Sequence, residues 1–131
     1  MTNKEILEIA LRQSAYDLNC APEDLISGKN LVTISRSHPK ARKYLDLPLS
    51  CDLVSYGSNI VAQCSEELIP FVRQYIDRYP VEHCFETPNL HVLEDMLRPF
   101  GQKVCFMAEY FLPDVGALRE LPCDYELRIL Y

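Results

Sequence analysis

PVEHCFETPNLHVLEDMLRPFGQKVCFMAEYFL, residues 80–112, is the stretch that decides the fold predicted from this sequence. It begins with a short β-prone run at residues 81–85. A helical run follows, with Thr87 as N-cap, Pro88 in the first turn and apolar residues at helical spacing. Residues 104–112 are aromatic and apolar enough for a strand buried on both faces. We predict a strand–helix–strand unit, with parallel strands if the two are neighbours in one sheet.

The N-terminal part of the chain predicts a helix and a first strand. Thr2 and Glu5 match a capping box, and apolar residues continue the pattern to about Asn19. Residues 31–35 (LVTIS) form a strand candidate, and the polar, proline-containing residues 37–48 indicate a loop.

A β-hairpin is predicted in the middle of the chain. Residues 57–58 (Gly-Ser) separate two β-prone runs and suit a type II′ turn. That turn places Cys51 opposite Cys64, and Leu53 opposite Ala62, with the cysteines at a non-hydrogen-bonded position. A cross-strand disulfide is one interpretation, but two buried thiols are favoured in a reducing compartment.

A second helix follows the hairpin. An acidic first turn (Ser65, Glu66 and Glu67) precedes a helix over residues 68–79, and Pro80 ends it. Its apolar stripe consists of Phe71, Val72, Tyr75, Ile76 and Tyr79.

Composition bounds the class of protein. The 131 residues fit one domain, and the apolar share of 48% with a charged share of 24% is ordinary for a globular protein. The net charge of −6 argues against nucleic acid and acidic membranes as partners. The sequence has no run long enough for a membrane span and does not begin like a secretory signal, so a cytoplasmic location is expected. In that compartment the six cysteines are expected to be reduced thiols, and because they contain no C-x-x-C pair we expect no metal site.

Three groups of residues are candidates for a catalytic or binding role. His83 and Cys84 are adjacent, so in a strand they point to opposite faces, and a satisfied histidine is favoured over a catalytic one. His91 and Glu94 are three apart on the helix, a spacing also common on helix surfaces. The basic cluster at residues 36–43 (RSHPKARK) is a solvated loop or a phosphate site, with the loop favoured. Motifs for nucleophilic catalysis or phosphate cradles are missing, and we assign no catalytic, cofactor-binding or metal-binding residue.

The sequence resembles a known family in its second half. ETPNLHVLEDMLRPFGQKVCFMAEYFLPD (residues 86–114), followed by CDYELRIL (residues 123–130), is similar to the N-terminal region of clostridial-type members of the GNAT superfamily of N-acyltransferases. In those proteins such a region precedes the catalytic domain. The resemblance implies that residues 1–122 are an accessory domain and that residues 123–131 are the first strand of a following catalytic domain.

The order of predicted elements also resembles the GNAT core itself. It implies an α+β fold with a mixed, GNAT-like central sheet of about five to six strands and flanking helices. Asn89, Leu97 and residues 100–101 (Phe-Gly) resemble the later helix of that fold, although its exit has Gly-Phe. The acyl-CoA loop pattern Gln/Arg-x-x-Gly-x-Gly/Ala is replaced by residues 64–70 (CSEELIP), which have no glycine, two carboxylates and a proline. We therefore expect that this segment does not bind CoA.

Two functions follow as expectations. The favoured one is a non-catalytic, inactive N-terminal domain whose parent transfers an acetyl group from acetyl-CoA to an amine. Its partner would be the C-terminal catalytic domain of the same chain, and a homodimer is possible. The alternative is a self-contained acyl-CoA-binding or small-ligand-binding domain with an acyl-transfer site near His83 and His91, together with Glu82 and Glu94. In that alternative the phosphate ligands are Arg36, Lys40, Arg42 and Lys43.

Overall fold

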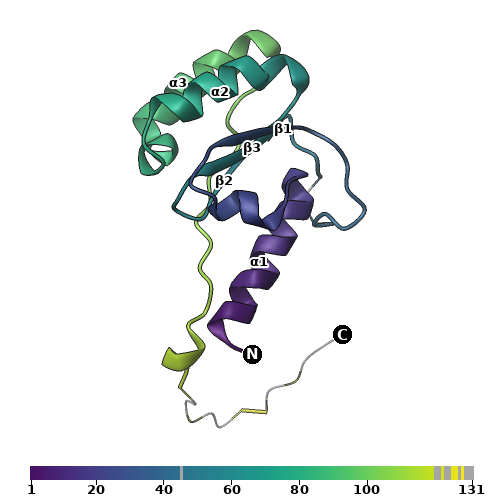
Figure 1. Cartoon of the computed structure of the whole chain (residues 1–131), viewed down its shortest axis with the longest axis vertical. Helices are drawn as coiled ribbons and strands as arrows, with labels where there is room; N and C mark the ends of the chain where they lie inside the picture. Colours follow the sequence, from purple (N-terminus) through teal and green to yellow (C-terminus); the bar gives the residue numbers. More distant parts are fainter. Residues whose placement is uncertain (45, 120–121, 123–124, 127, 129–131) are drawn as a thin grey trace.

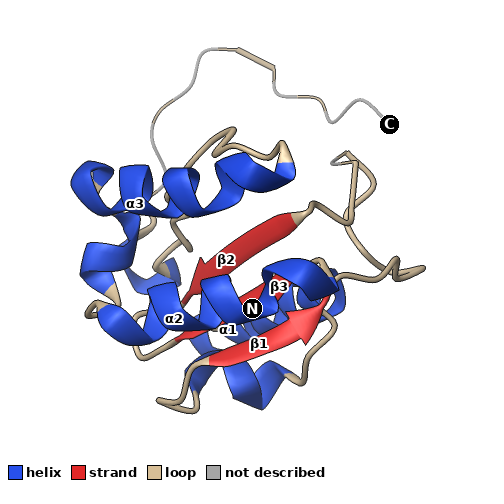
Figure 2. Ribbon diagram, turned by 90° about the horizontal axis from the view of Figure 1, so that it is seen from above, coloured by secondary structure: helices blue, strands red, loops and turns tan. Residues whose placement is uncertain are grey.

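The computed structural model describes residues 1–44, 46–119, 122, 125–126 and 128. Within these residues the chain is a mixed α+β fold in which helices cover both faces of a small sheet (Figures 1 and 2). The α-helices are α1 (Asn3–Leu18), α2 (Ile69–Arg78) and α3 (Thr87–Leu97). The strands are β1 (Leu31–Ile34), β2 (Cys51–Ser55) and β3 (Ile60–Cys64). Among the described residues, no helix has both the length and the apolar content that a membrane span requires.

The sheet is three-stranded, with the order β1-β3-β2. β3 lies in the centre, parallel to β1 and antiparallel to β2. The hairpin prediction is confirmed, because Cys51 pairs with Cys64 and Leu53 pairs with Ala62. Gly57, with a φ of 102°, supplies the positive φ that the first position of a type II′ turn requires.

β3 divides the interior into two cores, because all five of its residues are buried and successive side chains point to opposite faces. Ile60, Ala62 and Cys64 face the larger core, which contains buried residues of α2, α3 and the turn between them: Val72, Tyr75, Ile76, Cys84, Leu93 and Leu97. Val61 faces the smaller core, which contains Leu11, Ala15, Leu18 and Leu25. The sheet therefore separates an α2/α3 layer from an α1 layer (Figure 1).

α1 is capped at both ends, although only its second half is packed. Thr2 and Glu5 form the predicted capping box, and Asn19 ends the helix in the left-handed conformation with a φ of 54°. The buried residues of α1 all lie from Leu11 onward. The first half extends beyond the sheet (Figure 1), and the side chain of Ile9 remains 50% exposed.

The predicted strand–helix–strand unit is wrong at both flanks, and the sheet does not have five to six strands. Residues 81–85 form a 3₁₀ helix (Glu82–Phe85) in which the N–H groups of His83 and Cys84 donate to the carbonyl of Pro80. Those backbone groups are satisfied locally, so the run needs no sheet partner. The central helix, α3, is as predicted, except that it begins at Thr87 with Glu86 as N-cap.

Residues 104–118, named here the extended segment, are not a strand buried on both faces. They run as a separate trace away from the sheet (Figure 1) and pair with none of its strands. Its large apolar side chains are exposed: Phe106, Met107, Tyr110, Phe111, Leu112, Val115 and Leu118. The strand expected at the end of the chain, with the domain boundary at residue 123, lies largely outside the described residues.

Candidate functional site: a pocket between α1 and the loop after β1

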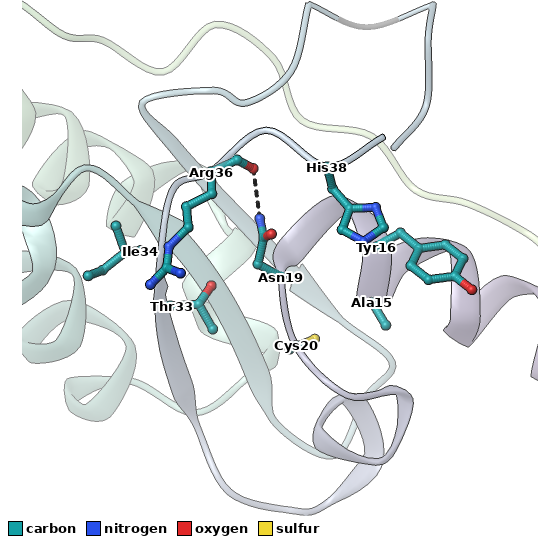
Figure 3. Close-up of a pocket in the computed structure, with 8 residues that line it drawn as sticks. All are labelled: Ala15, Tyr16, Asn19, Cys20, Thr33, Ile34, Arg36 and His38. Carbon is teal, nitrogen blue, oxygen red and sulfur yellow. Dashed lines mark hydrogen bonds between the residues drawn. The ribbon is translucent and has the colours of Figure 1, made fainter. Parts of the chain in front are cut away.

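A pocket of about 550 Å³ lies where α1 ends and β1 leaves the sheet (Figure 3). This is within the range of small-molecule sites. Its wall has three parts: the last turn of α1, the end of β1 and the loop that follows. The lining residues are Ala15, Tyr16, Asn19, Cys20, Thr33, Ile34, Arg36 and His38.

The loop at this pocket is held against α1 at both ends. Near its start, the side chain of Asn19 donates to the carbonyl oxygen of Arg36 at 2.8 Å (Figure 3). Further on, the side chain of Gln13 donates to the carbonyl oxygen of Lys40 at 3.0 Å. Between these points, the ring of His38 stacks on Tyr16 with centroids 4.9 Å apart. The structure therefore places Arg36 and His38 of the basic cluster on the pocket wall, whereas Lys40 and Lys43 remain exposed to solvent, as expected for a solvated loop.

Asn19 connects this wall to the central strand. Its side-chain amide also donates to Oε1 of Gln63, which is fully buried on β3. Gln63 in turn donates to the carbonyl oxygen of Asp17 at 3.0 Å. The buried side chain of Gln63 thus has partners for both its oxygen and its nitrogen, and these hydrogen bonds hold the last turn of α1 in place.

The cations of the basic cluster have different roles. Arg42 forms an ion pair with Asp17, whose side chain is only 5% exposed. Lys40 places its ammonium 5.3 Å from the centre of the Tyr16 ring. Arg36 is exposed, and its guanidinium lies beside Thr33 and Ile34 on the pocket wall (Figure 3). Arg42 therefore stabilises the fold by pairing with Asp17, whereas the charges of Arg36 and Lys40 are exposed at the surface.

His38 has a defined hydrogen-bonding state. Its Nδ1 accepts a hydrogen bond from the backbone N–H of Lys40 at 3.1 Å. A neutral imidazole that accepts at Nδ1 carries its proton on Nε2. The ring therefore has one remaining donor, which has no acceptor among residues 1–44 and the other described residues.

Cys20 contributes a neutral thiol to the pocket. Burial raises its pKa to about 11, and the nearby charge of Asp24 adds to the effect. Near neutral pH the sulfur is therefore protonated, which makes it a poor nucleophile and leaves no negative charge on this wall.

The histidines of the alternative acyl-transfer site lie elsewhere. His83 is exposed on the 3₁₀ helix, and its Nδ1 is 2.8 Å from the carboxylate of Glu86, a partner that was not foreseen. His91 is exposed on α3, one turn from the partly buried Glu94. Glu82 is exposed as well. This group belongs to the α2/α3 layer, whereas the basic cluster lies against α1, so the structure does not bring the two halves of that site together.

The other cysteines that the structure describes divide between the interior and the surface. Cys64 and Cys84 are buried, Cys51 is partly buried, and Cys105 is exposed. Cys51 and Cys64 are free thiols, as favoured from the sequence. The backbone N–H of Ser65 donates to the carbonyl of Ser50, so the neighbouring Cys51–Cys64 pair sits at a non-hydrogen-bonded position. In the described part of the chain, histidine, cysteine and acidic side chains form no group that could hold a metal ion.

Sequence reasoning missed Tyr16, Asn19 and Thr33 as parts of a site. Asn19 could have been recognised as a helix end, since asparagine is the commonest residue after glycine in the left-handed conformation that ends a helix. Tyr16 and Thr33 gave no such signal, because each lies within an ordinary helix or strand pattern. Comparison of the chain with protein-family models, with curated proteins and with solved structures gave no match.

Proposed function

We propose that this chain is the non-catalytic N-terminal domain of a GNAT-type N-acetyltransferase, and that its extended segment docks on the catalytic domain. The parent would transfer an acetyl group from acetyl-CoA to an amine in the cytoplasm. The proposal that the segment docks rests on the exposure of its apolar side chains. Phe111 is 85% exposed and Tyr110 is 68% exposed. The link to acetyl transfer comes from the sequence resemblance.

The extended segment supports docking because its backbone is also available. A β-prone run without a sheet partner offers N–H and C=O groups for strand pairing with another domain. Its position is defined at the far end, where Asn3 donates to the carboxylate of Asp114 and accepts from the N–H of Val115, each at 2.8 Å. The segment therefore presents an apolar surface beside the uncovered first half of α1 (Figure 1).

The region that corresponds to an acyl-CoA loop supports the non-catalytic part. Glu66 and Glu67 are exposed in a 3₁₀ helix that precedes α2, where their charge would repel a pyrophosphate. The N–H of Leu68 donates to the carbonyl of Ser65 and is not available for a ligand. Pro70, in the first turn of α2, supplies no N–H at all.

Turnover is the first test of this proposal. The chain is incubated with acetyl-CoA and a panel of primary amines, and release of the free thiol of CoA is followed. We expect no release above the rate without protein. Catalytic release that is lost in His83→Ala or His91→Ala, but not in the surface variant Arg73→Gln, would contradict the proposal and favour the self-contained acyl-transfer domain.

Hydrogen exchange tests the docking part. Amide exchange at residues 104–112 is compared between this chain and the longer parent polypeptide that the proposal requires. We expect rapid exchange in the chain alone and strong protection in the parent, with Phe111→Ser restoring rapid exchange. Equally rapid exchange in both proteins would show that the segment does not dock there.

A further inference from the structure

We propose that the pocket between α1 and the loop after β1 binds a phosphate-bearing small molecule, with Arg36 and Nε2–H of His38 as donors. Both residues line the pocket. This binding function is separate from acetyl transfer and does not depend on the docking proposal.

The first argument is the supply of unused donors. Arg36 contributes its backbone carbonyl to the bond from Asn19, whereas its guanidinium has no protein acceptor among the described residues. His38 uses Nδ1 as an acceptor, and within the described residues its Nε2–H has no acceptor. Lys40 adds a second positive group beside Tyr16. The Arg36 guanidinium, which lies toward Thr33 and Ile34, matches the oxygens of a phosphate group, and the His38 ring N–H, on the Tyr16 side, can donate to a second acceptor of the same ligand (Figure 3).

The second argument is the balance of charge beside the pocket. Asp17 is paired with Arg42 and also accepts from the Arg42 backbone N–H at 2.9 Å. Asp24 keeps its charge, which raises the pKa of Cys20, and its carboxylate accepts from the N–H of Ala21 at 2.8 Å. Cys20 is a neutral thiol. Arg36 and Lys40 therefore supply two positive charges here against the one negative charge of Asp24, although the whole chain has a net charge of −6.

The third argument is that the backbone carrying the donors is held in place. The Asn19 bond fixes the backbone of Arg36, although its guanidinium stays exposed, and the stack with Tyr16 fixes the ring of His38. Gln63 on β3 holds Asn19 from within the core. The His38 ring therefore loses little conformational entropy when a ligand binds, whereas the Arg36 side chain becomes ordered on binding. The pocket volume of about 550 Å³ exceeds that of a single phosphate, which indicates a phosphorylated small molecule.

The experiment is a titration followed by the NMR amide shifts of the isotope-labelled chain. The probes are inorganic phosphate, pyrophosphate and, as a carboxylate control, acetate, with ionic strength held constant by sodium chloride. We expect saturable shifts at residues 16–20 and 33–38 with phosphate and pyrophosphate, and none with acetate. Equal binding of acetate would overturn the phosphate assignment, and absence of saturable shifts with all three probes would overturn the site.

Variants separate a built site from general electrostatics. Arg36→Gln should weaken phosphate binding about tenfold, because one charge-assisted hydrogen bond is lost. Arg73→Gln removes the same charge from an exposed position of α2, on the other side of the sheet, and should leave binding unchanged. His38→Phe keeps an aromatic ring for the stack on Tyr16 but removes the donor, and should also weaken binding. Equal weakening in Arg36→Gln and Arg73→Gln would show diffuse attraction and contradict the proposal.

Discussion

Arg42 holds the carboxylate of Asp17 from two directions, through its backbone N–H and through Nε of its side chain. Because the Asp17 side chain is only 5% exposed, replacing Arg42 would leave a buried carboxylate without its cation. We expect Arg42→Gln to lower the free energy of unfolding by about 3 kcal/mol, measured by urea denaturation.

A double-mutant cycle checks the origin of that loss. Asp17→Asn removes the charge that Arg42 neutralises, so the double variant should be more stable than Arg42→Gln alone. The matched control is Arg98→Gln, which breaks an exposed pair with Asp95 and should cost less than about 1 kcal/mol. Similar losses for Arg42→Gln and Arg98→Gln would contradict the buried-pair interpretation.

Replacing Asp52 on β2 should increase the stability of the chain in a pH-dependent way. Burial raises the pKa of its carboxyl and Asp17 adds to the effect, while Arg42 and a backbone hydrogen bond oppose it. The folded chain therefore binds this proton more tightly than the unfolded chain, and ionisation reduces stability as the pH rises above about 3.8. We expect Asp52→Asn to raise the melting temperature at pH 7, with the gain vanishing below about pH 3.8.

Asp95→Asn is the control for this prediction, because Asp95 is exposed on α3 and pairs with Arg98 at the surface. It should give no gain at any pH. A constant difference between Asp52→Asn and the original chain across the titration would exclude a contribution from ionisation of Asp52.

Tyr75 connects α2 to the 3₁₀ helix before α3. Its buried hydroxyl donates to the carbonyl of Cys84 at 2.7 Å. Tyr75→Phe keeps the ring but leaves that carbonyl without its donor, so we expect a loss of about 1–2 kcal/mol in thermal or urea unfolding. Tyr79→Phe, on the neighbouring ring, removes a hydroxyl from a partly exposed position and should change stability by less than about 0.5 kcal/mol.

The cysteines should differ sharply in their rates of alkylation. Burial raises the pKa of Cys51 to about 12, helped by Cys64, and the pKa of Cys64 to about 11. At pH 8 both thiols are almost entirely protonated, whereas Cys105 is exposed to the reagent. Iodoacetamide labelling followed by mass spectrometry should modify Cys105 first, with Cys64 protected until the chain unfolds. Cys64 labelling as fast as Cys105 would mean that the β2–β3 pair opens readily.

The local rules of the sequence predicted several elements correctly. The Gly-Ser turn at residues 57–58 determined the hairpin register, because a two-residue loop fixes which residues face each other. Thr2 and Glu5 located the beginning of α1, since a capping box depends on neighbours only. The stripe of α2 was correct for Val72, Tyr75 and Ile76.

Elements that depend on distant partners were not predicted. Residues 81–85 are a β-prone run, but five residues are too few to distinguish a strand from the turn that follows Pro80. Residues 104–112 have strand propensity without an adjacent sheet edge, and propensity contains no information about which edges are free. Phe71, expected in the buried stripe of α2, is 38% exposed and meets Phe100 at the edge of the core.

The pocket shows the same limit. The basic residues are visible in the sequence, where their pattern favours a solvated loop over a phosphate site. The role of each arginine depends on Asp17. Its carboxylate forms an ion pair with Arg42, whereas the Arg36 guanidinium has no acceptor among the described residues. Nothing in the spacing of residues 36–43 distinguishes these two arginines.

Because the side chains of β3 are buried in both cores, the register in which β3 pairs with its neighbours tolerates no shift. Deleting one residue from the turn at residues 56–59 would rotate every β3 side chain to the opposite face. Gln63 would then enter the apolar layer beneath α2, and its hydrogen bond to the carbonyl oxygen of Asp17 would be lost. Natural variation in chain length should therefore accumulate in the loop between β1 and β2 and be absent from the β2–β3 hairpin.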